Sequence, residues 1–508
     1  MQIRPAVLSL IPFLVVIAAP EAVLRAADEV AEKTDAVVFL DIVSRSEGAP
    51  GKKSVDDFVV LSEVSKKDPY HAVVDVLTKG ERTEVLYFDR RRLGPLFDKL
   101  EKRKPGVVAV VIRPGSLDVN FHFEFLERAS RLDADPFVDF TFGYLTGATA
   151  EEAVAFVEGI RAAMKKKPAK SVLEFGPSRQ PRALTGAAPH AWADGFKSRK
   201  LSHPEDEADV PKLLRAAKGI GVLSAWGHGM PDGVDHGMTG RALRESGLDL
   251  HPALYFSGPC YCGVTGRWFG LERGAVTEKR VAPEDSFLLA LIKARVTAAF
   301  AGLDPDRGET NHHELDHVLL TGDPLGMASK STYDDVVVAY RRPELKLPRY
   351  EVGKRRPYRD IHDNMISGSA CRALFGDPRF RPFPKAGEDP FRVRHEWTSK
   401  GLVVTWIGGD NLGKTWMPVD INRANGSWTH RLRFRFELPL DKVKKLTKFE
   451  VLAVTKDGKD LPYLYPTAAL ETWGGKLIVH ALIVFPVNPS DRALWGGKEY
   501  VARLRFPK

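Results

Sequence analysis

Cysteine is scarce in this chain, with only three among 508 residues: Cys260, Cys262 and Cys371. An odd number cannot be paired completely within one chain, so at least one thiol stays outside any internal disulfide. Beyond the N-terminus no stretch approaches the ~18 apolar residues that a membrane span needs, which excludes further spans. Low-complexity tracts and short-period repeats are missing as well, so solenoids and disordered tails are excluded.

The N-terminus has the pattern of a secretory signal peptide over residues 1–27. Arg4 provides a positive start, an apolar stretch runs from Ala6 to Ala19, and small residues follow at Ala26–Ala27. No cysteine is near the cleavage region, so we expect no lipid anchor. The mature protein should be secreted or periplasmic, where an unpaired thiol is a liability unless it is buried or used.

The composition is that of an ordinary globular protein, with 44% hydrophobic and 28% charged residues, and the length predicts two or three domains. The net charge is +9, but lysines and arginines are spread along the chain and interleaved with 66 acidic residues. This distribution indicates a diffuse basic surface and no nucleic-acid partner.

Strand and helix patterns alternate from Phe58 to Met164, which predicts a parallel, doubly wound α/β sheet. The last helix of this run starts with a capping box, Thr149 followed by Glu152. A basic, proline-containing stretch from Lys165 to Pro204 then predicts a long connection. We expect a first α/β subdomain over residues 28–200.

A second α/β subdomain is predicted over residues 201–388, beginning with the helical pattern "EDEADVPKLLRAAKG". Its strand "GIGVLSAW" runs into Gly227-His228-Gly229, and its strand "PALYFSG" runs into Cys260-Tyr261-Cys262-Gly263. A third strand, "VTAAFAGL", runs into an acidic loop. The carboxyl ends of parallel strands meet at one edge of a sheet, where ligands and reacting groups collect.

The residue types at this edge suit nucleophilic catalysis. A cysteine attacks as the thiolate, and a histidine on the neighbouring strand can protonate a leaving amine. Adjacent glycines leave backbone amides able to approach a developing oxyanion. We therefore interpret Cys260 and His228 as a catalytic pair, with backbone amides near Gly229 and Cys260 as oxyanion donors. The alternative stays open that His228 is a turn residue and Cys260 a packed core thiol.

The motifs "WGHG" and "CYCG" resemble the gingipain-type cysteine peptidases, members of the caspase-like fold that also includes clostripain and legumain. In that family one strand ends in His-Gly and the next in a Cys-x-x-Gly turn, so His228 falls on the catalytic histidine and Cys260 on the nucleophile. The segments "DFTFGYLTGATAEEAVAFVEGI", "TAAFAGLDPDRGE" and "SACRALFGDPRF" extend the resemblance over residues 55–385. It implies a caspase-like fold and hydrolysis of peptide bonds.

The chain departs from the family at two places. Tyr144 stands where the family usually has an arginine, and "MPDGVDHG" follows His228 where small residues and a tryptophan are usual. Cys262 is a reserve nucleophile because it also fits a caspase-like Cys-x-Gly pattern, and His236 is a reserve histidine. We interpret Cys371, in "SACRALFG", as a core residue.

The third loop carries a rival motif. "HELDH", from His313 to His317, has the His-Glu-x-x-His pattern, in which two imidazoles bind zinc and the glutamate, here Glu314, acts as general base. No histidine or glutamate follows at the usual spacing of a third ligand. We therefore expect no metal and no other cofactor, and keep a zinc-dependent hydrolase as an alternative.

Acidic residues of the same loop predict a substrate preference. Asp304, Asp306 and Glu309 are accompanied by a single cation, Arg307, and a cleft walled by carboxylates favours a cationic side chain. We expect cleavage after Arg or Lys. The alternative is that these acids are solvated loop charges.

Residues 389–508 change character to short strands with turn signals, which predicts an immunoglobulin-like β-sandwich. Gingipain-like proteins often carry such a sandwich after the catalytic unit. We therefore expect a secreted cysteine endopeptidase that takes a protein or peptide substrate. A non-catalytic binding protein on the same fold and the zinc hydrolase are the alternatives, and the sequence predicts no oligomeric state.

Overall fold

The computed structural model describes residues 40–41, 57–176, 197–202, 218–225, 227–234, 238–305, 314–315, 317–319, 321–357, 361–384, 391–408, 419–422, 427–439, 446–463, 465–487 and 499–507. The predicted signal peptide, most of the helix predicted over residues 205–219, and His236 lie outside these residues. No helix in the described part of the chain is long and apolar enough to cross a membrane.

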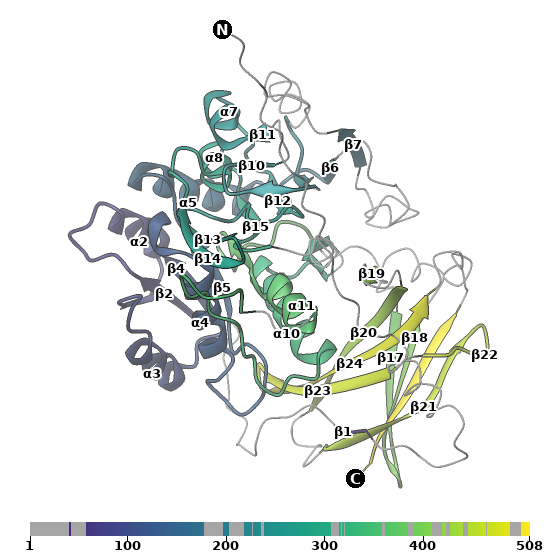
Figure 1. Cartoon of the computed structure of the whole chain (residues 1–508). Coiled ribbons are helices and arrows are strands. Elements are labelled where there is room, and N and C mark those ends of the chain that lie inside the picture. Colours follow the sequence, from purple (N-terminus) through teal and green to yellow (C-terminus); the bar gives the residue numbers. More distant parts are fainter. Residues whose placement is uncertain are drawn as a thin grey trace.

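A ten-stranded central sheet organises about the first three quarters of the chain (Figure 1). Its strands are β2 (Phe58–Ser62), β3 (Glu84–Tyr87), β4 (Val107–Val111), β5 (Thr141–Leu145), β6 (Ser171–Gly176), β7 (Lys197–Ser202), β8 (Val222–Ala225), β12 (Leu254–Ser257), β15 (Ala298–Gly302) and β16 (Arg372–Phe375). They lie in the order β3-β2-β4-β5-β16-β15-β12-β8-β6-β7. The chain is thus a mixed α/β protein with a large, mostly parallel sheet.

The sheet has two halves that run in opposite directions. Neighbouring strands from β3 to β16 are parallel, and so are those from β15 to β7, but β15 and β16 are antiparallel. The halves join where β16 pairs with β15, with Phe300 opposite Leu374 and Gly302 opposite Arg372. As a result, the start of β16 lies at the edge where β12 and β15 end.

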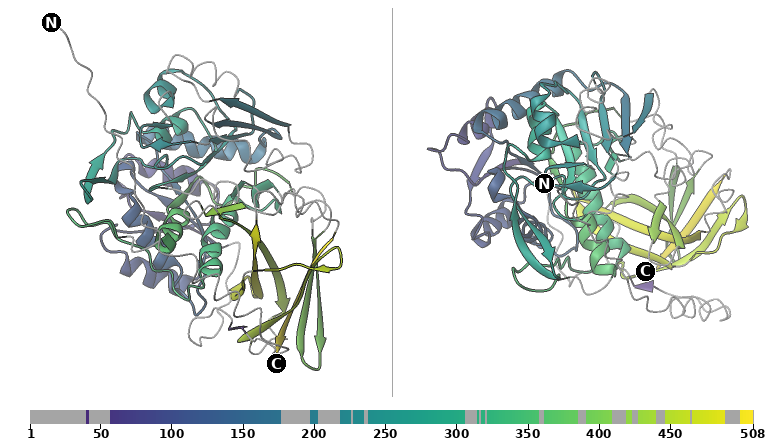
Figure 2. Two further views of the ribbon diagram at one scale, coloured as in Figure 1. Left: turned by 45° about the vertical axis from the view of Figure 1, so that its right-hand side comes forward. Right: turned by 45° about the horizontal axis from the view of Figure 1, so that its top comes forward.

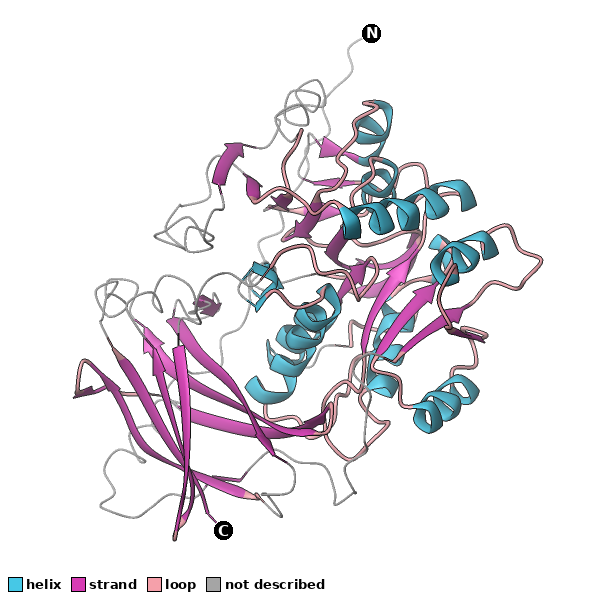
Figure 3. Ribbon diagram, turned by 180° about the vertical axis from the view of Figure 1, so that it is seen from behind, coloured by secondary structure: helices cyan, strands magenta, loops and turns pink. Residues whose placement is uncertain are grey.

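Helices cover both faces of the sheet (Figure 3). They are α2 (His71–Thr78), α3 (Gly94–Arg103), α4 (Val119–Ala129), α5 (Ala150–Lys165), α7 (Gly240–Glu245), α8 (Phe287–Lys293), α10 (Leu325–Ala339) and α11 (Ile361–Ala370). On one face α2, α5, α8 and α7 contact each other in turn. On the other, aromatic contacts join α3 to α4 and α4 to α10. This arrangement confirms the prediction of an α/β protein with a large, mostly parallel sheet.

The predicted start of α5 is confirmed, because the Thr149 hydroxyl accepts a hydrogen bond from the amide of Glu152. The predicted connection from Lys165 to Pro204 is wrong in part, because it contains β6 and β7. Most of β7 ("KSRKLS") is polar, as suits a strand at the edge of a sheet, and it therefore lacks an apolar pattern. Both strands pair with the half that contains β8.

Two small antiparallel elements follow the ends of β8 and β12. One comprises β9 (Gly229–Met230), β10 (Gly233–Val234) and β11 (Met238–Thr239), and the other is the hairpin β13 (Arg267–Glu272) and β14 (Ala275–Arg280). Arg273 and Gly274 both have positive φ, 50° and 80°, as a type I′ hairpin turn requires. Sequence reasoning did not predict this hairpin.

The C-terminal strands form two antiparallel sheets. One contains β17 (Phe391–Thr398), β18 (Gly401–Gly408), β21 (Lys448–Lys456), β22 (Lys459–Asp460), β25 (Tyr500–Pro507) and, from the start of the chain, β1 (Leu40–Asp41). The other contains β19 (Val419–Asn422), β20 (Ser427–Pro439), β23 (Tyr465–Trp473) and β24 (Lys476–Val487). Side chains from both sheets, such as Trp406 and Ile483, share one core.

Helix α10 lies between the central sheet and the C-terminal strands (Figures 1 and 2). Its Val337 and Val338 share a small buried cluster with Ala469 of β23 and Leu482 of β24. Beside this cluster, the buried Lys330 ammonium lies 2.6 Å from a carboxylate oxygen of Glu471. The two parts of the molecule are therefore joined by both apolar and charged contacts.

Candidate functional site

Three neighbouring strands end at the edge that sequence analysis singled out. Strand β12 lies between β8 and β15, and all three are parallel. The register pairs Ala225 with Ser257, the last residues of β8 and β12. His228 and Cys260 each follow closely after these strand ends, and Asp304 follows β15. The fold thus brings the three loops that carry the predicted site residues to one edge of the sheet.

Gly229 lies directly against the Cys260 turn. A Cβ atom on Gly229 would come within 2.1 Å of the Cys260 carbonyl oxygen, 2.7 Å of Pro259 Cβ and 2.9 Å of Cys262 Sγ. Only glycine fits at this distance, since real Cβ contacts under 3.0 Å are essentially unknown. The backbone next to His228 therefore contacts the segment that carries both candidate thiols.

Backbone hydrogen bonds hold this turn on both sides. On the β8 side, the Gly258 amide donates to the Ala225 carbonyl at 2.8 Å. On the β15 side, the amides of Tyr261 and Gly263 donate to the carbonyls of Asp304 and Gly302, at 3.3 and 2.8 Å. Tyr261 has a φ of 58°, an uncommon conformation for a bulky residue, which is found where surrounding structure enforces it.

Burial distinguishes the cysteines. All three lie among the described residues, and none is in a disulfide. Cys260 is half-buried, whereas Cys262 and Cys371 are buried. The Cys371 thiol contacts the carbonyl oxygens of Gly368 at 3.4 Å and Asp304 at 3.8 Å. Cys260 is therefore the thiol that reagents and substrates can reach most readily, and Cys371 is a core residue as predicted.

Asp304 is only 1% exposed, and its carboxylate contacts other residues of the protein. The Tyr350 hydroxyl donates a hydrogen bond to it, and Arg356 Nη2 lies 3.9 Å away. Burial, with the Asp304 carboxylate nearby, raises the pKa of Tyr261 well above its usual range. Asp304 is thus held inside the protein by Tyr350, while Asp306 and Glu309 lie outside the described residues.

The "HELDH" segment has different contacts from those of a zinc site. Glu314 is buried and ion-paired with Arg372, with 2.6 Å between Oε2 and Nη2. Burial raises the pKa of Glu314, and the Arg372 guanidinium opposes that shift. His317 Nε2 lies 3.1 Å from Asp323, and His313 lies outside the described residues. Glu314 is therefore held by a cation of the protein, which does not suit a general base on a metal-bound water.

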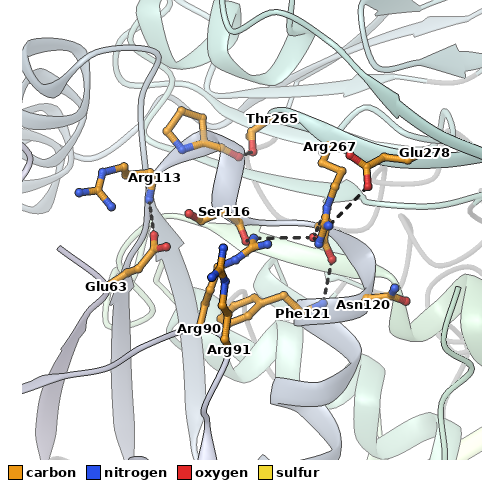
Figure 4. A network of polar contacts seen from close by, with 12 residues as sticks. Glu63, Arg90, Arg91, Arg113, Ser116, Asn120, Phe121, Thr265, Arg267 and Glu278 are labelled. Carbon is orange, nitrogen blue, oxygen red and sulfur yellow. Dashed lines mark hydrogen bonds and ion pairs between the residues drawn. The ribbon is translucent and has the colours of Figure 1, made fainter. Parts of the chain in front are cut away.

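The segment after the Cys260 turn is anchored to the first half of the chain (Figure 4). The Thr265 hydroxyl donates to the Pro114 carbonyl at 2.6 Å, and Arg267 Nε donates to Asp118 at 2.8 Å. Asp118 is fully buried and also caps α4, accepting from the amide of Phe121 at 2.9 Å. Polar contacts with residues 114–118 therefore support the segment that follows the cysteines.

Sequence reasoning missed Arg372, Tyr350, Arg356 and Asp118. The sequence did hint at Arg372, because this charged residue begins the otherwise apolar strand "RALF", where it is buried. A buried charge needs a partner, which would have pointed to an acid elsewhere. Tyr350 and Arg356 lie in a segment without a strand or helix pattern, so nothing in the sequence connects them to Asp304.

The chain matches no protein-family model and no curated protein. Among solved structures it is similar to one described as "Structure of Protease", with a TM-score of 0.43, 10% identity, and coverage of 85% of this chain and 92% of that one. It also shows a likeness to D-lactate dehydrogenase with NAD+ from Lactobacillus jensenii, with a TM-score of 0.14, 13% identity, and coverage of 48% and 77%.

Proposed function

We propose that the protein is a cysteine endopeptidase of gingipain type, in which Cys260 attacks a peptide carbonyl and His228 transfers the proton. The observation that carries this proposal is the contact of Gly229 with the Cys260 turn. It joins the loop of a histidine to the loop of a half-buried thiol across adjacent strands. Acyl transfer by a cysteine needs a nucleophile and a base within reach of each other, and the contact of these two loops supports that pairing.

The reaction follows from the properties of these groups. The Cys260 thiolate forms a bond to the carbonyl carbon, and the tetrahedral oxyanion is stabilised by backbone amides near Gly229 and Cys260. The carbon–nitrogen bond breaks as His228 gives a proton to the leaving amine, which leaves a thioester on Cys260. Water, deprotonated by His228, then adds to the thioester, and the acid product departs with the thiol restored.

Cys262 remains the reserve nucleophile, but burial argues against it. Its Sγ faces the backbone of Gly229, which leaves little room for a substrate carbonyl. A thiol in such a place behaves as a small apolar side chain. We assign it a packing role beneath the loop that follows β8.

Single cysteine variants test the nucleophile. Cys260→Ala should abolish peptide hydrolysis and labelling by fluorescent iodoacetamide, while Cys262→Ala and Cys371→Ala should keep both. The labelling rate of the parent protein should also fall as the pH is lowered through the pKa of the thiol. Activity lost in Cys262→Ala and retained in Cys260→Ala would move the nucleophile to Cys262. Activity retained in both would exclude cysteine catalysis.

Substrate preference is a separate part of the proposal. We keep cleavage after Arg or Lys as the expectation, with Asp306 and Glu309 as the acids that would favour it. Asp304 has a different role in this picture, as a buried anchor for Tyr350. A positional-scanning peptide library tests the preference, and a profile dominated by Asp or by large apolar residues at the cleaved position would contradict it.

The remaining parts of the proposal are export through residues 1–27, a caspase-like central unit and an immunoglobulin-like arrangement of the C-terminal sheets. Sequencing the N-terminus of protein recovered outside the cytoplasm tests the first. If Cys260 shows no enhanced reactivity and no peptide is cleaved, the alternative of a binding protein on the same fold is favoured. Zinc that co-purifies in stoichiometric amount and is needed for hydrolysis would favour the metal-dependent alternative.

A further inference from the structure

A fully buried arginine lies beneath the end of strand β12. Arg372 is the first residue of β16, and its side chain is 0% exposed. Because β16 is antiparallel to β15, this first residue lies at the edge where the neighbouring strands end. The guanidinium therefore lies at the edge that carries the Cys260 turn.

The Arg372 guanidinium bonds the strand that leads to Cys260. Its Nη1 donates to the Ser257 carbonyl at 2.5 Å, and its Nη2 lies 3.5 Å from the Phe300 carbonyl. The pairing of β12 with β15 ends at Phe256 and Phe300, so the Ser257 carbonyl lies one residue beyond it. Only Gly258 and Pro259 separate this carbonyl from Cys260.

Glu314 fixes the guanidinium in this position. Its Oε2 accepts from Arg372 Nε at 2.9 Å and from Nη2 at 2.6 Å. The Tyr333 hydroxyl donates to the Arg372 carbonyl at 2.6 Å, which holds the backbone of the same residue. A buried guanidinium without a carboxylate would be costly, so the ion pair and the bond to Ser257 depend on each other.

We propose that Arg372, held by Glu314, is a positioning residue that sets the place of Cys260 relative to the loop of His228. This inference rests on the proposed function for its catalytic meaning. The planar guanidinium donates along several directions at once and so joins Glu314 to the carbonyls of two strands. A lysine at the same position has one ammonium on a flexible chain and cannot make the same set of bonds. The glutamate of "HELDH" thus acts on the peptidase site through an arginine.

The test is Arg372→Lys, which keeps the charge and removes the fork of donors. We expect the kcat for peptide hydrolysis and the rate of Cys260 alkylation to fall by about tenfold or more, with KM within about twofold of the parent. Glu314→Asp, which keeps the charge but withdraws the carboxylate by one methylene, should give a smaller loss of the same kind. If Arg372→Lys does not fold, Glu314→Asp alone decides.

Lys330→Met is the matched control, because Lys330 is a buried cation paired with carboxylates at the contact with the C-terminal strands. It should lower the melting temperature and leave Cys260 alkylation unchanged when all proteins are assayed well below their melting temperatures. Unchanged alkylation and kcat in the folded Arg372 or Glu314 variant would overturn the proposal. If the parent cleaves no peptide but these variants still slow Cys260 alkylation, the positioning role stands and the proposed function fails.

Discussion

The carbonyl oxygen of Cys260 occupies the space that a side chain on Gly229 would need, within 2.1 Å of where its Cβ would lie. The loops after β8 and β12 therefore touch where the Gly229 backbone lies against the Cys260 carbonyl and the side chains of Pro259 and Cys262. Because the two loops are already in close contact, the position of the loop after β8 depends on that of the loop after β12. This contact fixes the spacing between the backbone beside His228 and the turn that carries Cys260.

Gly229→Ala should displace the Cys260 turn. The added methyl group meets backbone, which cannot move aside as a flexible side chain would, so we expect a loss of about 1–3 kcal/mol in the free energy of unfolding. Cys260 alkylation should slow as well. Gly94→Ala is the control, because nothing lies within 4 Å of a Cβ there. Chemical denaturation and alkylation rates check both, and a fully stable, fully reactive Gly229→Ala protein would contradict the contact.

Asp118→Asn should destabilise the anchor of the hairpin that starts at β13. Asparagine still caps α4, so the change isolates the lost charge. Asp118 is fully buried and paired with Arg267, which would keep only its longer contact with Glu278, at 3.6 Å, so the change should cost about 2–4 kcal/mol in urea denaturation. Asp285→Asn, at the pair with the exposed Arg241, should change stability much less. Equal effects of the two changes would count against this account.

His122 should make stability depend on pH. It is buried, its Nε2 lies 2.9 Å from the Ala370 carbonyl, and burial lowers its pKa from 6.5 to about 4. Between pH 6.5 and 4, His122 is protonated in the unfolded chain but neutral in the folded chain. The free energy of unfolding therefore falls as the pH is lowered from 6.5 toward 4. The loss from this residue should reach about 3 kcal/mol. Denaturation of parent and His122→Gln across this range should show a shallower slope for the variant, and parallel slopes would refute the assignment.

Lys330→Met should weaken the contact between α10 and the C-terminal strands. The Lys330 ammonium bonds Asp334 at 2.9 Å and lies 2.6 Å from Glu471, and all three are buried. Without it, two carboxylates remain buried together, which should cost about 3–5 kcal/mol. Calorimetry should show a lower melting temperature or separated transitions. Lys476→Ala, at an exposed pair with Glu437, should change stability by no more than about 1 kcal/mol.

The alternation of strand and helix patterns was enough to predict a mostly parallel α/β sheet, because the spacing of apolar residues follows which side chains are buried. Strands β6 and β7 were not predicted. β7 lies at an edge and carries lysines and arginine, and β6 lies next to it, so neither is a long apolar run. The hairpin β13–β14 was missed because its turn, Arg273-Gly274, is a weaker signal than Asn-Gly.

The candidate site was predictable where it depends on strand ends. His228 and Cys260 follow apolar strands directly, and their meeting at one edge follows from parallel pairing alone. The ion pair of Glu314 and Arg372 was not predictable, because the two residues are 58 positions apart and pair through an antiparallel strand. The same holds for Tyr350 and Asp304, which are brought together by a segment without regular structure.

Strand β1 gives the C-terminal sheet an edge taken from the opposite end of the chain, with Leu40 paired to Phe449. During synthesis, β1 therefore leaves the ribosome roughly 400 residues before its partner strand. A contact of such high sequence separation forms late in folding. A fragment restricted to residues 389–508 would display the N–H and C=O groups of β21 as an open edge and would be prone to self-association. A synthetic peptide covering residues 36–43, added in trans, should restore it to a monomer.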